Sequence, residues 1–260
     1  MIVPELCDFC QLRCTLCWNR NRRGSGRQME LKTVERILEM FGGGRKWGGY
    51  SWYNWGEPLL HKHFIEFSEM VKHTKTSISS NFSLPLTDAH FKAFHNIQQM
   101  VVSMSGLTPE VYAHYHVGGN HALVMQNLEK LRGHPKVRIN WLMHPYNKHQ
   151  FEMMKDWCAE RGWEFGYFRA NCEVEELVDG FTHPWIKTQR QYSGRHMQNC
   201  KMKKWFLMDV DGNYLVCCGS HNVKVGLSIW DDVTGDEIYA EKIKHPLCVE
   251  CTKKEYWRMF

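Results

Sequence analysis

The chain has 260 residues, and 43% of them are hydrophobic, so it can bury one sizeable core or a main domain with a small annex. Its longest apolar runs are well short of the roughly 18 residues that a membrane span needs, and its opening residues do not resemble a secretion signal. The net charge of +5 comes from 33 basic and 28 acidic residues spread along the chain. We therefore expect a cytoplasmic protein with no membrane or nucleic-acid partner.

Short apolar runs alternate with helical periodicity up to about residue 170. Strands are expected at residues 1–6, 50–55, 76–82, 99–105, 136–144 and 163–169. Helices are expected at residues 31–41, 63–73, 88–97, 121–133 and 150–162, and another is expected after the fourth strand. This alternation predicts an α/β protein with a parallel sheet, open or closed into a partial barrel.

The pattern changes toward the C-terminus. Residues 181–198 are polar and aromatic without periodicity, which is typical of a linker. Residues 205–218 form two apolar runs around Asp-Gly-Asn, which predicts a β-hairpin. We therefore expect a first domain at residues 1–180 and a small second domain at residues 199–260.

Nine of the eleven cysteines gather near the two ends of the chain, and only Cys158 and Cys172 lie between. Their odd number and the absence of a secretion signal argue against a disulfide framework, so metal binding is expected. The first group is Cys7, Cys10, Cys14 and Cys17, and the second is Cys200, Cys217, Cys218, Cys248 and Cys251.

Cys10, Cys14 and Cys17 follow the first strand and precede the first helix, where the active sites of βα barrels lie. Three thiolates can hold three irons of a cubane cluster and leave the fourth iron open. A structural zinc ion is normally bound by four protein ligands. Zinc with Cys7 as the fourth ligand is the alternative, because Cys7-x2-Cys10 and Cys14-x2-Cys17 are zinc-like pairs.

The C-x3-C-x2-C spacing of Cys10, Cys14 and Cys17 resembles the signature of the radical SAM superfamily. The resemblance implies a partial (β/α)6 TIM-like barrel and a [4Fe–4S] cluster whose open iron chelates S-adenosylmethionine. It further implies reductive cleavage of this cofactor to a 5'-deoxyadenosyl radical, with a flavodoxin- or ferredoxin-type protein as electron donor.

Other segments are similar to the cofactor-binding motifs of that family. "WGEPLL" resembles its Gly-Gly-Glu motif, with Trp55 in the first glycine position, and "SISSNFS" resembles the strand that ends Thr-Asn-Gly, with Phe82 where glycine is usual. Ser103 and Ser105 lie at the end of the fourth expected strand. Serines at strand ends commonly act as caps, so a capping role is the alternative for these two residues. The resemblance implies cofactor contacts from Leu16, Trp18, Gly56, Glu57, Pro58, Asn81, Ser103 and Ser105.

The C-terminal cysteines match a second pattern. Cys200, Gly212 and Cys217 have the spacing that opens SPASM and twitch domains, and Cys248-x2-Cys251 adds two ligands. The resemblance implies a small C-terminal twitch (SPASM-like) domain of hairpin and helix, with an auxiliary [4Fe–4S] cluster on Cys200, Cys217, Cys248 and Cys251. A zinc ribbon on the same four cysteines is the alternative.

Together the two resemblances predict an oxidoreductase or epimerase that abstracts hydrogen from a C–H bond of a polar small molecule, such as a sugar or aminocyclitol. The alternatives are radical modification of a ribosomally made peptide, by epimerisation or crosslinking, and a non-catalytic zinc-binding interaction module. Candidate catalytic residues are the thiols of Cys218 and Cys172, as hydrogen donors, and Arg169, as a substrate contact. Buried apolar cysteines and an arginine that bridges to a neighbouring acid are the ordinary alternatives.

Overall fold

A computed structural model describes residues 1–15, 17, 19, 25–134, 136–169, 204–217 and 223–251, and it describes only the backbone of Arg169, Glu250 and Cys251. The predicted linker and most of the boundary between the two expected domains lie outside these ranges. None of the helices in the described ranges is long and apolar enough to cross a bilayer.

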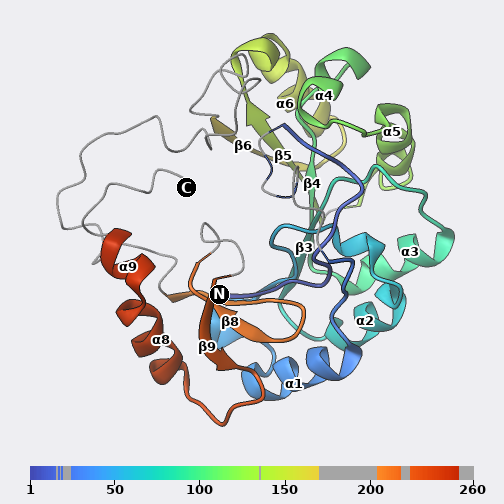
Figure 1. Ribbon diagram of the computed structural model, residues 1–260. Helices are drawn as coiled ribbons and strands as arrows, with labels where there is room; N and C mark the ends of the chain where they lie inside the picture. The colour runs from blue at the N-terminus through green and yellow to red at the C-terminus, as the bar shows by residue number, and fades with distance from the viewer. Residues whose placement is uncertain are drawn as a thin grey trace.

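A nine-stranded sheet forms the centre of the molecule, in the order β6-β5-β4-β3-β2-β1-β7-β8-β9 (Figure 1). Each of the first six strands pairs in parallel with its neighbour in sequence. This topology confirms the predicted partial (β/α)6 barrel. The six strands are β1 Ile2–Pro4, β2 Tyr50–Ser51, β3 Thr76–Ser80, β4 Gln99–Ser103, β5 Val137–Met143 and β6 Glu164–Arg169.

Helices α1 to α6 follow these strands and form an arc along one side of the sheet (Figure 1). α1 has the predicted bounds and buries Val34, Ile37 and Phe41. The α-helices are α1 Leu31–Phe41, α2 Phe64–Val71, α3 Asp88–Ala93, α4 Pro109–Tyr115, α5 His121–Glu129 and α6 Phe151–Ala159. Short 3-10 helices are η2 Arg45–Trp47, η3 Pro58–Leu60, η4 Phe94–Asn96 and η5 Pro145–Gln150. The main core lies between the sheet and this arc, and it includes Trp52, Phe67, Ile78, Phe94, Val102, Leu128, Trp141 and Met154.

The second strand is shorter than predicted. β2 covers only Tyr50–Ser51, although the apolar and aromatic run continues to Trp55. The backbone N–H groups of Trp55 and Gly56 donate to the carboxylate of Glu5 and not to a neighbouring strand. Tyr53 N donates to Ser51 O at 2.9 Å, so the chain has already turned away from the neighbouring strand before Trp55.

The predicted hairpin is present and continues the barrel sheet. β7 (Phe206–Met208) pairs in parallel with β1, and β8 (Asn213–Leu215) pairs antiparallel with β7. β9 (Lys224–Ser228) adds a third strand that was not predicted. It is followed by α8 (Gly235–Lys244) and α9 (Pro246–Cys251), whereas the prediction of a hairpin and helix domain gave no helix bounds. The sequence of α8 shows no clear apolar periodicity, because the helix buries only Ile238 and Lys242. Figure 1 shows α8 and α9 beside this C-terminal end of the sheet.

Candidate functional site

The three cysteines of the C-x3-C-x2-C motif lie on the long loop between β1 and α1. Two backbone hydrogen bonds close the base of this loop, from Met29 N to Leu6 O at 2.9 Å and from Asp8 N to Arg27 O at 3.2 Å. Because the loop leaves the carboxyl end of a parallel strand, it lies at the edge of the barrel where active sites form.

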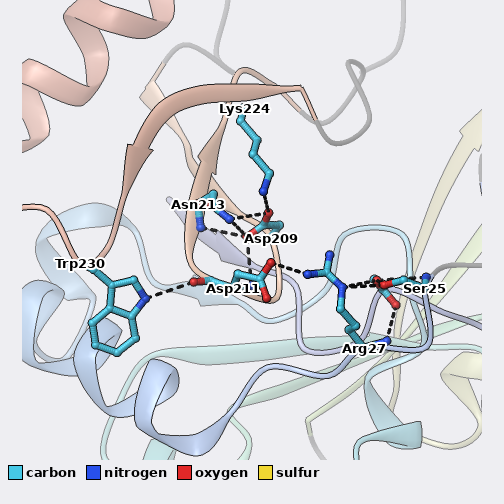
Figure 2. A network of polar contacts seen from close by, with 8 residues as sticks. Ser25, Arg27, Asp209, Asp211, Asn213, Lys224 and Trp230 are labelled. Atoms are coloured by element: carbon cyan, nitrogen blue, oxygen red, sulfur yellow. Dashed lines mark hydrogen bonds and ion pairs between the residues drawn. The ribbon is translucent and has the colours of Figure 1, made fainter.

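A polar network fastens the base of this cysteine loop to the C-terminal hairpin (Figure 2). The carboxylate of Asp8 accepts from the backbone N–H of Arg27 at 2.9 Å and from that of Ser25 at 3.2 Å. The guanidinium of Arg27 in turn forms an ion pair with Asp211, in the turn between β7 and β8. Residues that are far apart in sequence thereby join the cysteine loop to the segment that carries Cys217.

The hairpin turn is itself ordered by its own side chains (Figure 2). The carboxylate of Asp209 accepts from both the backbone N–H and the side-chain amide of Asn213, and Lys224 lies 3.2 Å from it. Trp230 Nε1 donates to the backbone oxygen of Asp211 at 3.2 Å. The partner of Arg27 is thus held in a defined position.

The three thiols of the loop are half-buried, and Cys14 lies near enough to the other two to interact with them electrostatically. Burial raises the pKa of the Cys10 thiol to about 12. Burial also raises the pKa of Cys14, and the neighbouring Cys17 and Cys10 thiols raise it further. Three thiolates here are unfavourable without a cationic partner, which an iron–sulfur cluster supplies because it binds deprotonated cysteine.

Among the residues that the structure describes, no three His, Cys, Asp or Glu side chains converge closely enough to hold one metal ion. Cysteine is the residue type that ligates iron–sulfur clusters, and the role of Cys10, Cys14 and Cys17 as ligands of such a cluster stays a prediction.

The segment that resembles the Gly-Gly-Glu motif packs directly on the cysteine loop. Glu57 N donates to the backbone oxygen of Phe9 at 2.8 Å. A Cβ atom on Gly56 would lie 1.8 Å from the backbone oxygen of Cys7, so only glycine fits at this position. The cysteine loop and this segment are thus one packed unit.

Glu5 also holds the segment that resembles the Gly-Gly-Glu motif, although it was not among the predicted site residues. Its Oε1 accepts from Trp55 N at 2.8 Å and from Gly56 N at 3.0 Å. Burial raises the pKa of this carboxyl to about 7, although the two backbone hydrogen bonds oppose the shift. The only local sign in the sequence is an acid placed directly after an apolar strand.

Glu57 is 2% exposed and connects the loop after β2 to the end of β3. Its Oε1 accepts from Leu59 N at 3.0 Å, and its Oε2 accepts from Asn81 N at 2.8 Å. Burial raises its pKa to about 7. Pro58, the next residue of the motif, begins η3. A contact of Glu57 with the cofactor stays a prediction, whereas its hydrogen bond from the loop after β2 to Asn81, which follows β3, is observed.

The polar residues predicted after β3 and β4 make hydrogen bonds within the protein. Asn81 Oδ1 accepts from Gln11 Nε2 and from Ser83 N, both at 2.9 Å. The hydroxyl of Ser105 accepts from Leu142 N at 3.2 Å. Ser103 is the last residue of β4 and is half-buried. Cofactor contacts from Asn81, Ser103 and Ser105 stay predictions.

Phe82 takes the backbone conformation that glycine usually supplies. Its φ is 54°, in the left-handed region that disfavours side chains. Its ring is fully buried and stacks on Phe94 with 5.7 Å between ring centroids. Burial of the ring offsets the backbone strain, so this chain keeps the turn although it lacks the usual residue.

The cysteine loop also docks on the segment that follows α4. Thr15 N donates to Tyr115 O and Arg13 N donates to Val117 O, both at 2.9 Å. His116 lies between these two contacts, is 1% exposed, and has a pKa lowered to about 3, chiefly by burial. The sequence alone does not single out this residue, because it is one of fifteen histidines.

Several predicted site residues lie outside the described part of the chain. Cys217 follows β8 and Cys248 lies in α9, both half-buried. The residues outside the description are Leu16, Trp18, Cys172, Cys200 and Cys218, together with the side chains of Arg169 and Cys251. The auxiliary cluster therefore stays a prediction.

A family model described as the radical SAM superfamily matches residues 5–158, which is more than half of the chain. No curated protein matches the chain.

Solved structures share the fold at low identity. Streptococcus suis SuiB bound to S-adenosylmethionine is 16% identical with a TM-score of 0.60, and the match covers 96% of this chain and 67% of SuiB. BtrN in complex with AdoMet and 2-DOIA is 16% identical with a TM-score of 0.52, covering 98% of this chain and 86% of BtrN. Native anSMEcpe with bound AdoMet and Cp18Cys peptide is 15% identical with a TM-score of 0.65, covering 99% of this chain and 83% of anSMEcpe. This chain thus spans about two thirds of SuiB and most of the other two.

Proposed function

The chain belongs to the radical SAM superfamily, and from that premise we propose that it is an enzyme that abstracts hydrogen from a C–H bond of a polar small molecule, such as a sugar or an aminocyclitol. Cys10, Cys14 and Cys17 hold the [4Fe–4S] cluster in this proposal. The cluster and S-adenosylmethionine, when bound, supply the 5'-deoxyadenosyl radical by one-electron cleavage of the cofactor. A flavodoxin- or ferredoxin-type protein delivers the electron.

The observation that carries the substrate class is the polar face of the sheet that points away from the helices. Strand alternation places Ile78, Val102 and Ile139 in the core against the helices. Five of their six neighbours along the strands are polar and partly exposed on the opposite face, namely Ser77, Ser79, Ser103, Arg138 and Asn140, and the sixth, Val101, is apolar and buried. Such a face supports a substrate with several hydroxyl or amino groups.

Hydrogen bonds hold several of these polar side chains in place. Arg138 Nε donates to Asn140 Oδ1 at 3.1 Å, and its Nη1 lies 3.0 Å from Glu164. The hydroxyls of Ser51 and Ser77 are 3.1 Å apart on neighbouring strands. Hydrogen abstraction needs the reacting carbon to be held in one orientation, and preorganised polar groups favour this.

The outcome of the reaction depends on the C-terminal segment. We propose that Cys200, Cys217, Cys248 and Cys251 hold an auxiliary cluster in a twitch-like domain, which would accept an electron from the substrate radical and give oxidation. The pairing of β7 with β1 and the ion pair between Arg27 and Asp211 support this, because they fix the segment against the cysteine loop. A hydrogen atom returned by a thiol such as Cys218 would give epimerisation instead.

Peptide modification is a second candidate, and two neighbours favour it. SuiB was solved bound to the precursor peptide SuiA, at 17% identity and a TM-score of 0.61 over 97% of this chain, and anSMEcpe was solved with the Cp18Cys peptide. The non-catalytic zinc module has no such support, since family membership implies an enzyme.

Deuterium transfer tests the substrate class directly. The reconstituted enzyme is incubated with S-adenosylmethionine, a reductant and per-deuterated candidates, in parallel sets of sugars, aminocyclitols and short peptides. Deuterium in 5'-deoxyadenosine from a sugar or aminocyclitol alone is the expected result. Deuterium from peptides alone would overturn the small-molecule assignment. Loss of that label in Asn140→Ala, compared with an exposed Arg132→Gln control, would connect the reaction to the polar face, because Asn140 pairs with Ser103 at the carboxyl end of β4.

A further inference from the structure

His116 and the sulfur of Cys14 form the contact from which this inference starts. His116 Nδ1 lies 3.7 Å from Cys14 Sγ. The other ring nitrogen, Nε2, lies 3.1 Å from the backbone nitrogen of Ser105. A backbone N–H can only donate, so Nε2 is an acceptor and the ring proton is on Nδ1. The contact is therefore an N–H···S hydrogen bond with the histidine as donor.

The surroundings of the His116 ring fix its orientation. The ring stacks on Tyr112, with centroids 4.4 Å apart and an interplanar angle of 18°, and the edge of Tyr115 packs against it at 4.9 Å. Ser105, which sets the tautomer, is itself held because its backbone oxygen accepts from Asn147 Nδ2 at 2.9 Å. The Nδ1–H group is thus aimed at Cys14 before any cluster binds.

A second side chain donates to another cysteine of the same loop. Asn81 Nδ2 lies 3.5 Å from Cys10 Sγ, which also accepts from the backbone N–H of Leu12 at 3.4 Å. Gln11 donates to Asn81 Oδ1 at 2.9 Å, so the amide group presents its NH2 side to the sulfur. Two of the three motif cysteines therefore receive a hydrogen bond from a fixed side chain.

We propose that His116 and Asn81 are positioning residues that set the reduction potential of the cluster held by Cys10, Cys14 and Cys17 through these N–H···S hydrogen bonds. This inference rests on the proposed function. One electron from a one-electron donor adds negative charge to the cluster and its thiolate sulfurs, and the two N–H dipoles stabilise that charge without transfer of a proton. Hydrogen bonds to the sulfurs are one of the main determinants of cluster potential.

Two amide substitutions of His116 distinguish its hydrogen bond to Cys14 Sγ from its hydrogen bond with the backbone N–H of Ser105. His116→Asn places an amide N–H near the position of Nδ1 and keeps a donor to Cys14. His116→Gln places its amide near the position of Nε2, where it accepts from Ser105 but leaves Cys14 without the donor. His61→Gln is the control, since His61 is also buried but hydrogen-bonds to the backbone oxygen of Met29.

The measurement is an EPR-monitored potentiometric titration of the reconstituted protein with dithionite as reductant. The relevant signal is the one that S-adenosylmethionine perturbs and that Cys10→Ala/Cys14→Ala/Cys17→Ala lacks. His116→Gln is expected to lower the equilibrium constant for reduction about tenfold, which is about 59 mV for a one-electron couple. His116→Asn and His61→Gln are expected to stay near wild type.

The other outcomes distinguish failure of the hydrogen-bond inference from failure of the proposed function. Equal potentials for wild type and His116→Gln at unchanged iron content would refute the inference and leave the proposed function intact. Equal shifts in His116→Gln and His116→Asn would show that ring packing matters and the donor does not. Absence of any signal or iron that depends on the three cysteines would refute the proposed function together with this inference.

Discussion

Glu57 Oε2 accepts a hydrogen bond from the backbone N–H of Asn81 at 2.8 Å, and this contact joins the loop after β2 to the residue that follows β3. Its other oxygen accepts from Leu59 N at 3.0 Å. Both acceptors are buried, so neither backbone group can turn to water if the carboxylate is removed.

Glu57→Gln is therefore expected to destabilise the protein. The amide nitrogen of glutamine would face a backbone N–H, which leaves one donor without an acceptor and costs about 1–3 kcal/mol. Denaturant unfolding of the apo protein checks this, with Glu66→Gln on the exposed side of α2 as the control. An unchanged midpoint for Glu57→Gln would show that the contact contributes nothing to stability.

Gly56→Ala is expected to prevent assembly of the cluster on the cysteine loop. The added Cβ would lie 1.8 Å from the backbone oxygen of Cys7, so the loop has to move. Iron bound per chain after reconstitution is the measurement, and a loss of the iron that depends on Cys10, Cys14 and Cys17 is the expected result. Gly43→Ala is the matched control, because its Cβ would meet nothing within 4 Å. Full iron content in Gly56→Ala would contradict the packing described here.

Glu5 is expected to make the stability of the apo protein depend on pH. Its pKa is raised from 4.5 to about 7 by burial, so the folded state binds the proton more tightly than the unfolded state does. The contribution is present below about pH 4.5 and is lost as the pH rises to about 7, with a magnitude on the order of 3 kcal/mol.

Glu5→Gln tests this pH dependence, because the glutamine oxygen still accepts from Trp55 and Gly56 but carries no charge. Unfolding free energies from pH 4.5 to pH 8 are expected to fall less steeply in the variant than in wild type. Some slope remains, since burial raises the pKa of Glu57 to about 7 as well. Parallel curves for the two proteins would mean that Glu5 does not titrate in this window.

At position 82, the glycine variant is expected to be more stable than the alanine variant. Both substitutions remove the buried ring that stacks on Phe94, but only glycine adopts a φ of 54° without strain. Phe82→Ala is expected to be less stable than Phe82→Gly by about 1–2 kcal/mol, and both less stable than wild type. An alanine variant at least as stable as the glycine variant would show that the backbone changes its conformation at this position.

The sequence predicted the barrel well because its signal is local. The apolar periodicity of residues 31–41 matches α1, and the run of alternating residues at 136–144 matches β5. The bounds of α8 were not predicted because most of its surface faces water, although the reciprocal hydrogen bonds of Thr234 and Glu237 at its start follow a recognisable capping pattern.

The site was predictable only where its residues are close in sequence. The spacing of Cys10, Cys14 and Cys17 predicted a cluster loop from eight consecutive residues. Glu5 and His116 have no such pattern, because their partners Gly56 and Cys14 are distant in the chain. Only the folded structure brings these pairs together.

The central claim is that Cys10, Cys14 and Cys17 hold a cluster that cleaves S-adenosylmethionine. The most direct measurement compares wild type with Cys10→Ala/Cys14→Ala/Cys17→Ala after anaerobic reconstitution, with Cys158→Ala as a control for a buried cysteine outside the motif. Iron and sulfide are quantified, and 5'-deoxyadenosine is measured after adding S-adenosylmethionine and dithionite. We expect about eight irons in wild type and about four in the triple variant, with 5'-deoxyadenosine formed only by wild type and Cys158→Ala. Zinc without iron, or iron unaffected by the triple substitution together with no cleavage, would contradict the claim.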